Sequence, residues 1–282
     1  MPAPTFLCIG VQKGGTTWLA RAVGQHPQVA TGSRKELQFF NHREAYDRGL
    51  EWYEGQFRAR RRTRAIGEFT PNYWWTEGTT TANNYLGSAG RVAEAYPDLQ
   101  LVVCLRHPVD RAVSAYFHHM KAGRYPPSVG LLEAVERYPD VREFGDYGTQ
   151  LGAWLEHFPL ERFLFLVYED DIRPDHAKLP TLRRVFEHLG VRPGFEPVDL
   201  GLARNERGSH FDLRLKHAPP RTQRVMRALP APVRRWSRWD IEIAEADRAT
   251  LAAHYRPEIA RLEELLGRSM PWDLGAPRPS RR

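Results

Sequence analysis

The chain alternates between short, continuous apolar runs and longer stretches in which apolar residues recur with the period of a helix. The apolar runs cover residues 6–11, 65–69, 100–105 and 163–168. Runs of this length are typical of strands buried on both faces of a parallel sheet. The periodicity predicts helices from 16 to near 24–27, at 44–57 and 79–96, from 109 onward, at 172–189 and at 242–266, the last broken at Pro257. This alternation predicts an α/β fold with a central, mostly parallel sheet flanked by helices.

The first apolar run ends in a glycine-containing loop. Residues 5–19 read TFLCIGVQKGGTTWL, in which Lys13, Gly14 and Gly15 precede Thr16 and Thr17. Glycines let backbone N–H groups close around an anion, and a helix that begins at Thr16 turns its positive end toward it. A Walker A loop places its lysine after the last glycine, whereas this lysine comes first. The loop alone therefore leaves two interpretations open, a phosphate site and an ordinary strand–turn–helix connection.

A charged pair next to an apolar stretch is a candidate catalytic feature. Lys35 and Glu36 stand directly before Leu37, Phe39 and Phe40. One interpretation is a surface ion pair at the edge of a strand. The other is a carboxylate in a partly desolvated cleft, where it serves as a general base. Two further bases stay open at this stage, Glu68 at the end of the run 65–69 and His107.

The run 100–105 ends in a cation where a nucleotide kinase would place a magnesium-binding aspartate. Arg106 follows the run directly, and Ser114 lies two turns into the next predicted helix. A guanidinium and a hydroxyl from two elements can bind one phosphate together. Taken singly, Arg106 is also explained as a surface charge, and Ser114 as a serine on a helix face.

Three motifs in this order resemble those of sulfotransferases that use 3′-phosphoadenylyl sulfate (PAPS). Residues 13–18, KGGTTW, look like the loop that binds the 5′-phosphosulfate, and residues 106–114 look like the 3′-phosphate motif. Residues 35–40, KELQFF, are similar to the K-E-x-x-F-F stretch of the heparan sulfate branch, in which the glutamate is the catalytic base. The resemblance continues through residues 147–191, and residues 205–208 match a late nucleotide-binding loop approximately.

This resemblance implies a P-loop NTPase-like, three-layer fold and an enzyme that moves the sulfuryl group of PAPS to an acceptor hydroxyl, leaving PAP. The acceptor is expected to be a carbohydrate, a glycolipid or a hydroxylated small molecule. The expected catalytic residues are Glu36, Lys13 and Lys35. No metal is expected, because Lys13 and the helix N-terminus supply positive charge. The expected cofactor-binding residues are Lys13, Gly14, Gly15, Thr16, Thr17, Trp18, Arg106, Ser114, Arg207 and Gly208.

Composition bounds the remaining possibilities. The 282 residues are 41% apolar and contain no linker, which predicts one domain over 1–275 and a disordered tail at 276–282. No membrane-spanning run or secretory leader is seen, so a cytoplasmic protein is expected. Cys8 and Cys104 lie in predicted strands and indicate no disulfide.

The net charge of +7 favours an anionic partner. Arginines cluster at 60–64, and the basic, aromatic stretch 214–239 is either a cap over the acceptor site or plain surface. The alternatives to a sulfotransferase are a P-loop nucleotide kinase or ATPase and a non-catalytic module that binds nucleic acid, although no nucleic-acid partner is expected. The acceptor, the choice between O- and N-sulfation and the oligomeric state stay open.

Overall fold

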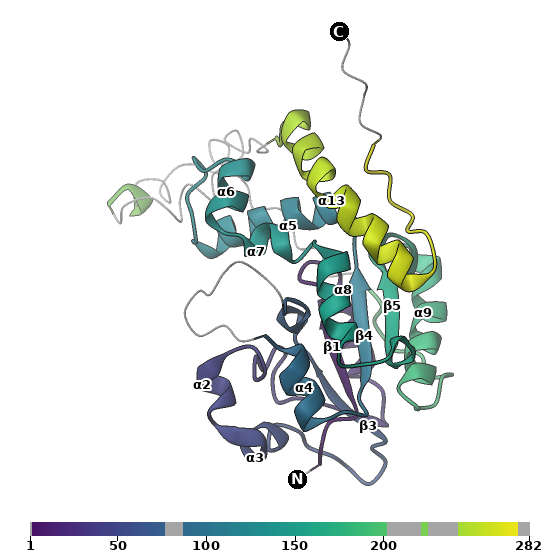
Figure 1. Ribbon diagram of the computed structural model, residues 1–282. Coiled ribbons are helices and arrows are strands. Elements are labelled where there is room, and N and C mark those ends of the chain that lie inside the picture. Colours follow the sequence, from purple (N-terminus) through teal and green to yellow (C-terminus); the bar gives the residue numbers. More distant parts are fainter. Residues whose placement is uncertain (1, 77–86, 202–220, 225–241, 276–282) are drawn as a thin grey trace.

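The computed structural model of the chain describes residues 2–76, 87–201, 221–224 and 242–275. Its centre is a single five-stranded sheet with the order β2-β3-β1-β4-β5, and every paired strand in the described residues runs parallel (Figure 1). The fold class expected from the sequence is therefore confirmed. The strands are β1 (Phe6–Gly10), β2 (Val29–Thr31), β3 (Ala65–Phe69), β4 (Gln100–Leu105) and β5 (Phe163–Val167).

Helices α1 to α8 connect these parallel strands, and α9 and α13 follow the last strand. Short 3₁₀ turns lie at Pro71–Trp74 and Leu160–Arg162, and a π turn at Tyr168–Ile172. The α-helices are α1 (Thr16–Val23), α2 (Arg43–Tyr46), α3 (Gly49–Glu54), α4 (Ala89–Ala95), α5 (Pro108–Ala122), α6 (Leu131–Arg137), α7 (Asp140–Glu143), α8 (Tyr147–Leu155), α9 (Asp175–His188) and α13 (Glu245–Leu266).

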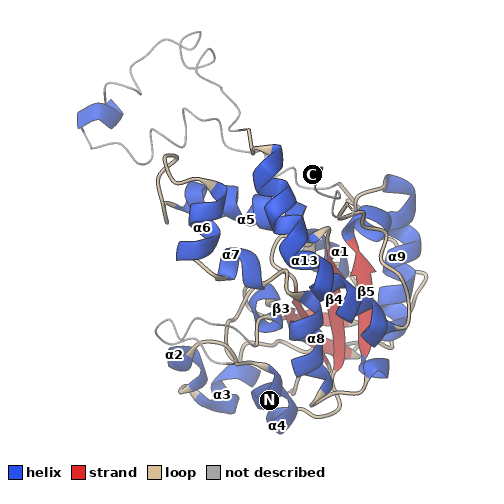
Figure 2. Ribbon diagram, turned by 45° about the horizontal axis from the view of Figure 1, so that its top comes forward, coloured by secondary structure: helices blue, strands red, loops and turns tan. Residues whose placement is uncertain are grey.

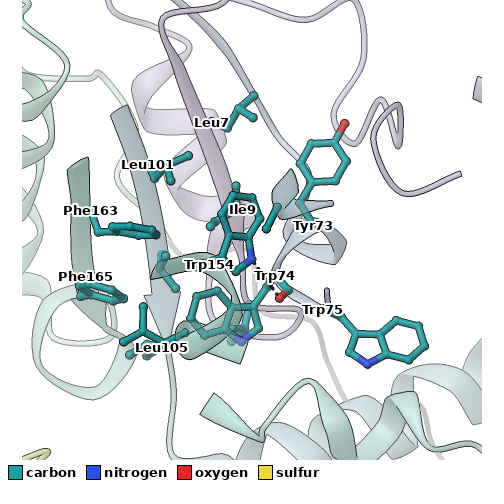
Figure 3. Close-up of a cluster of buried hydrophobic side chains, with 14 of the residues drawn as sticks. Leu7, Ile9, Tyr73, Trp74, Trp75, Leu101, Leu105, Trp154, Phe163 and Phe165 are labelled. Carbon is teal, nitrogen blue, oxygen red and sulfur yellow. Dashed lines mark hydrogen bonds between the residues drawn. The ribbon is translucent and has the colours of Figure 1, made fainter. Parts of the chain in front are cut away.

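Helices cover both faces of the sheet, which gives three layers (Figure 2). On one face, α1 and α9 pack against side chains of β1, β3 and β4. On the other face, α4, α8 and α13 enclose an apolar core in which Trp74 and Trp154 are the largest fully buried side chains (Figure 3). A further cluster joins α5 and α6 to the first half of α13. Alternate residues of each strand thus point into opposite layers, as a doubly covered sheet requires.

The strand order creates a switch point between β1 and β4. After β1 the chain turns toward β2 and β3, whereas after β4 it turns the other way toward β5. Open α/β sheets bind ligands at the carboxyl ends of the strands on either side of such a point. The loop after β1 carries Lys13, and the residue after β4 is Arg106. The topology therefore brings the two predicted phosphate motifs to the same edge of the sheet.

Two helix predictions were wrong in detail. The expected helix at 44–57 is two short helices, α2 and α3, separated at Gly49, whose φ of 81° is incompatible with a continuing helix. The predicted break at Pro257 is absent, because α13 runs through it. Packing against α8 explains this continuity: Thr149 donates to both carboxylate oxygens of Glu258, from its backbone N–H at 2.8 Å and its hydroxyl at 2.9 Å.

Several predictions fall outside the described residues. These are Arg207 and Gly208, the tail 276–282, part of the helix at 79–96 and most of the basic stretch 214–239. Within the described ranges, no helix is both long and apolar enough to cross a membrane.

The arginine cluster at 60–64 lies away from the switch point. Arg61, Arg62 and Arg64 line a pocket of about 420 Å³ with Arg192. These arginines precede β3, whereas the phosphate loop follows β1. Because the strands are parallel, the pocket lies at the opposite edge of the sheet and is separate from the site described next.

Candidate active site

The loop after β1 is held tightly against the end of β4. The N–H of Val11 donates to the carbonyl of Cys104 at 2.9 Å, and the N–H of Gly14 donates to the carbonyl of Val11 at 2.9 Å. A Cβ atom added at Gly14 would lie 2.1 Å from the Cys104 oxygen, which no side chain tolerates. Glycine at this position therefore allows the loop to lie directly on the neighbouring strand.

The same loop is shaped to receive an anion. Lys13 and Gly15 both have positive φ angles, 73° and 101°, so that the backbone turns its N–H groups to one side. In the described part of the chain, the N–H groups of Gly15, Thr16 and Thr17 have no backbone acceptor. They stand at the N-terminus of the eight-residue helix α1, where the helix dipole favours negative charge.

Lys13 lies in a strongly positive environment. Burial and the nearby cations of Arg106 and Lys35 lower the pKa of Lys13 below the usual lysine value, while the carboxylate of Glu36 acts in the opposite direction. Lys121 of α5 also contributes positive charge to this group. Lys13 therefore lies among charged residues from three separate segments. An anionic ligand would offset the repulsion between these cations.

Arg106 is fixed in place but keeps an unsatisfied donor. Its Nη1 donates to the carbonyl of Lys13 at 3.3 Å, and its guanidinium lies 4.9 Å from the centre of the Tyr168 ring. Its own carbonyl accepts from the hydroxyl of Tyr147 at 2.7 Å. The Nε atom is buried and has no partner among the described residues. Arg111 and Arg142 also have buried guanidinium nitrogens without a partner among the described residues, so this feature is not specific to Arg106. At the carboxyl end of β4, however, the free Nε of Arg106 is available to an acceptor such as a phosphate oxygen.

Glu36 is only partly buried, unlike the apolar residues that follow it. Its side chain is 36% exposed and contacts Nζ of Lys35, which is 29% exposed. Leu37, Phe39 and Phe40 are fully buried. The structure therefore shows the surface ion pair of the first interpretation, directly before a buried apolar segment. The role of Glu36 as a general base stays a prediction.

The backbone around Glu36 is strained. Glu36 and Gln38 have φ angles of 65° and 59°, a region that costs non-glycine residues about 1 kcal/mol or more. Such conformations persist only where the surroundings hold them, and they cluster at functional sites.

One face of α5 adds two residues that sequence reasoning did not assign to the site. Ser114, His118 and Lys121 follow a spacing of four and three residues and so share a helix face. Burial and the nearby charge of Lys13 lower the pKa of His118, and Glu36 opposes that shift. The helical period alone would have grouped both residues with Ser114.

The remaining predicted residues have distinct surroundings. Trp18 is buried, and its indole N–H donates to the carbonyl of Leu200 at 3.1 Å, so its side chain holds α1 against the segment that contains Leu200. Thr16 is buried and Thr17 is exposed. The Nε2 atom of His107 lies 3.4 Å from the carbonyl of Asp273. The place of each of these residues in the site stays a prediction.

The residues present fit a nucleotide with two anionic groups. The N–H cradle at the start of α1 offers one anion site, and the unsatisfied Nε of Arg106 offers another at the adjacent strand end. The donors are all cations and N–H groups, which suits phosphate and sulfate esters. Among the described residues no group of three His, Cys, Asp or Glu side chains could hold a metal ion.

Comparison with known proteins gives consistent matches. A profile described as the sulfotransferase domain matches residues 3–200. The chain is 30% identical to heparan sulfate glucosamine 3-O-sulfotransferase 6 of Mus musculus over 289 residues, which cover 96% of this chain and 74% of that protein. It is 34% identical to the Homo sapiens protein of the same name over 197 residues, covering 67% of this chain. That alignment spans 53% of the human protein, or about half of its length.

A solved structure resembles the whole fold. The sulfotransferase from Alicyclobacillus acidocaldarius superimposes with a TM-score of 0.69 at 25% sequence identity. The match covers 96% of this chain and 98% of that one. The architecture around the candidate site is therefore shared over nearly the full length of both chains.

Proposed function

The chain belongs to the sulfotransferase domain family, in the branch that contains the heparan sulfate 3-O-sulfotransferases, and we propose that it moves the sulfuryl group of PAPS to a hydroxyl group of a glycan acceptor. The observation that carries the proposal is that Lys13, in the loop after β1, feels the charges of both Arg106, directly after β4, and Glu36. The enzyme class and its dependence on PAPS follow from the family. The acceptor, the base and the order of events are the proposal.

Different residues of the chain have different roles in an in-line displacement. PAPS supplies the sulfuryl group and a phosphate oxygen as the leaving group. Lys13 and the N–H groups at the start of α1 stabilise the negative charge that develops on that oxygen. Arg106 and Ser114 hold the 3′-phosphate, which distinguishes PAPS from ATP. Because the acceptor must be in line with the leaving oxygen, positioning and charge stabilisation supply most of the rate enhancement.

Glu36 is proposed to accept the proton of the acceptor hydroxyl. Its side chain is exposed enough to reach a ligand and is close to Lys13. Lys35 contacts the carboxylate and so fixes its orientation before the acceptor binds. A general base placed this way contributes roughly a hundredfold to ten-thousandfold in rate. His107 is less well suited, since its ring already contacts the Asp273 carbonyl.

The choice of a glycan acceptor has two supports. The named relatives act, by their names, on glucosamine residues of heparan sulfate. In this chain, Lys35 contacts Glu36, and Lys35 and Lys121 both act on Lys13 with positive charge. This positive environment favours an acceptor with its own anionic groups. The experiment that follows therefore compares a polysaccharide with a glycolipid and a phenol.

The proposal is tested by transfer of radioactive sulfur from labelled PAPS. The enzyme is incubated with a desulfated heparan-type polysaccharide, a glycolipid and a phenol, with and without EDTA. We expect label in the polysaccharide at a rate unchanged by EDTA, because Lys13 and α1 provide the positive charge that Mg²⁺ supplies in kinases. Label in the phenol alone would contradict the glycan assignment. Loss of transfer in EDTA that Mg²⁺ restores would contradict the metal-free mechanism.

A further inference from the structure

Glu68, the fourth residue of β3, is a buried carboxylate whose two oxygens are both fully engaged. Its side chain is 1% exposed. The hydroxyls of Tyr53 and Tyr73 donate to Oε1 at 2.9 and 2.7 Å. The hydroxyl of Thr70 and the backbone N–H of Leu37 donate to Oε2 at 2.6 and 3.0 Å. Four donors around one carboxylate match its ionised form, which only accepts hydrogen bonds.

Three of these four donors connect Glu68 to the segment directly after Glu36. Leu37 binds Glu68 through its own N–H. The hydroxyl of Tyr73, while donating to Glu68, accepts from the N–H of Phe39 at 2.9 Å. The hydroxyl of Thr70 lies 3.5 Å from the N–H of Gln38. The hydroxyl of Tyr73 also lies 3.5 Å from the N–H of Phe40. The backbone N–H groups of four consecutive residues, 37–40, are therefore directed at a network centred on one carboxylate.

The network explains how the strained backbone at Glu36 and Gln38 persists. Both residues have positive φ, and Leu37, which lies between them, is bound to Glu68 itself. The aromatic ring of Phe39 stacks on that of Tyr53 with 4.5 Å between ring centres, so the same partners also fix the side chains. A loop held at both its amides and its rings has one orientation, and this orientation sets where the Glu36 carboxylate points.

Glu68 is not suited to act as the base itself. It is shielded from solvent and all its donors belong to the protein, so an acceptor hydroxyl has no route to either oxygen. Burial raises the pKa of Glu68, and the hydrogen bonds from Thr70 and Tyr73 oppose that shift. The hydrogen bonds from these partners thus stabilise the buried carboxylate of Glu68, whose role is to hold the residues around it.

We infer that Glu68 is a positioning residue for the sulfuryl-transfer reaction, which holds the segment 36–39 so that Glu36 faces Lys13 and the acceptor. This inference rests on the proposed role of Glu36 as base. Tyr73 and Thr70 are the links through which Glu68 acts, while Tyr53 contacts the carboxylate without contacting the backbone of the segment.

The two tyrosines provide a matched pair of variants. Tyr53→Phe and Tyr73→Phe each remove one hydroxyl from Oε1 of Glu68, but only Tyr73→Phe also frees the N–H of Phe39. We expect backbone hydrogen exchange at residues 37–40 to be about tenfold faster in Tyr73→Phe than in Tyr53→Phe, the change that loss of one buried hydrogen bond produces. The kcat should fall by about tenfold in Tyr73→Phe alone, and the affinity for PAP should change less than about twofold in both. Equal exchange and equal kcat in the two variants would overturn the inference.

A double-mutant cycle separates positioning from direct catalysis. Glu68→Gln keeps the size of the side chain but replaces one acceptor oxygen by a donor amide. We expect it to lower kcat by about tenfold or more in the wild-type background and by less than about twofold in the Glu36→Gln background, because a residue that acts through Glu36 has nothing left to position. Equal losses in both backgrounds would show that Glu68 acts independently of Glu36.

The readouts distinguish failure of this inference from failure of the proposed function. Hydrogen exchange at residues 37–40 reports on the loop whether or not Glu36 is the base. Faster exchange with unchanged kcat would overturn the positioning role while leaving sulfuryl transfer intact. Absence of transfer in the wild-type enzyme, together with the expected exchange pattern, would contradict the proposed function and not the loop network.

Discussion

Arg106 is the side chain proposed to bind the 3′-phosphate of the nucleotide. Its Nη1 is used by the Lys13 carbonyl and its face by the Tyr168 ring, yet its Nε is buried without a partner among the described residues. An arginine in this state forms a charge-assisted hydrogen bond to a phosphate at little further cost in entropy, because its rotamer is already fixed.

We predict that the wild-type chain binds PAP at least about tenfold more tightly than AMP, and that Arg106→Ala abolishes this preference. One or two charge-assisted hydrogen bonds contribute about 1.5 to 3 kcal/mol each, which exceeds one decade in Kd. Titration calorimetry measures both ligands. Arg162→Ala is the control, since Arg162 pairs with Asp98 outside the site. Equal affinity of the wild type for PAP and AMP would mean that Arg106 does not bind a 3′-phosphate.

At the residue scale, sequence order predicted the motifs and not their geometry. Lys13, Glu36 and Arg106 were identified because their neighbours form motifs, and motifs are local in sequence. The contribution of His118 and Lys121 depends on how α5 lies against the phosphate loop, which only the tertiary structure determines. Glu68 was identified from the sequence only as an alternative base, because the hydrogen-bond partners behind its proposed positioning role come from three segments.

At the element scale, four of the five strands in the described residues were predicted, whereas β2, with only three residues, was missed. Residues 65–69 and 100–105 are strands with the expected bounds, because continuous apolar runs leave few alternatives inside a covered sheet. Helices were less well predicted, since Gly49 divides one and tertiary packing carries another through Pro257. Local propensity is a weak guide where contacts with other elements decide the outcome.

The close approach of the phosphate loop to β4 gives a prediction about the loop as an element. Gly14→Ala should weaken PAP binding by at least about tenfold and destabilise the protein by about 2 kcal/mol, because the new methyl group would meet the Cys104 carbonyl and move the loop. Gly130→Ala is the control, as nothing lies within 4 Å of its added Cβ. Calorimetry and urea unfolding measure the two effects. Normal PAP affinity in Gly14→Ala would contradict the loop geometry described here.

At the scale of the whole molecule, buried histidines make stability depend on pH. Burial lowers the pKa of His119 to about 4, from an ordinary value near 6.5. Between these values the unfolded chain binds a proton that the folded chain does not, so the free energy of unfolding falls as the pH falls. Burial also lowers the pKa of His26 and His188, which act in the same direction.

We predict that the wild-type protein loses on the order of 2 kcal/mol of stability through His119 between pH 6.5 and pH 5, at about 1.4 kcal/mol per pH unit. Urea unfolding of the wild type and of His119→Gln at both pH values measures the difference. Comparison of the two proteins isolates His119, because Glu68, whose pKa is raised by burial, contributes with the opposite sign in both. An identical pH dependence in the two proteins would contradict the assignment.

The acceptor is the part of the function that the sequence could not predict. Donor binding uses backbone N–H groups and cations in compact motifs, whereas acceptor recognition depends on side chains spread over several loops. Part of the expected acceptor and nucleotide surface, including Arg207, Gly208 and most of 214–239, lies outside the described residues. The positive charge around Lys13 favours an anionic partner without identifying it.

The central claim is that Glu36 accepts the proton of the acceptor while the phosphate loop and Arg106 hold the donor. The most direct measurement is the rate of sulfuryl transfer by Glu36→Gln, with the acceptor that the wild type uses, together with its affinity for PAP. The account predicts a loss of roughly a hundredfold to ten-thousandfold in kcat with PAP affinity unchanged to within about twofold, because the substitution removes only the proton-transfer contribution. Near-normal turnover in Glu36→Gln would contradict it.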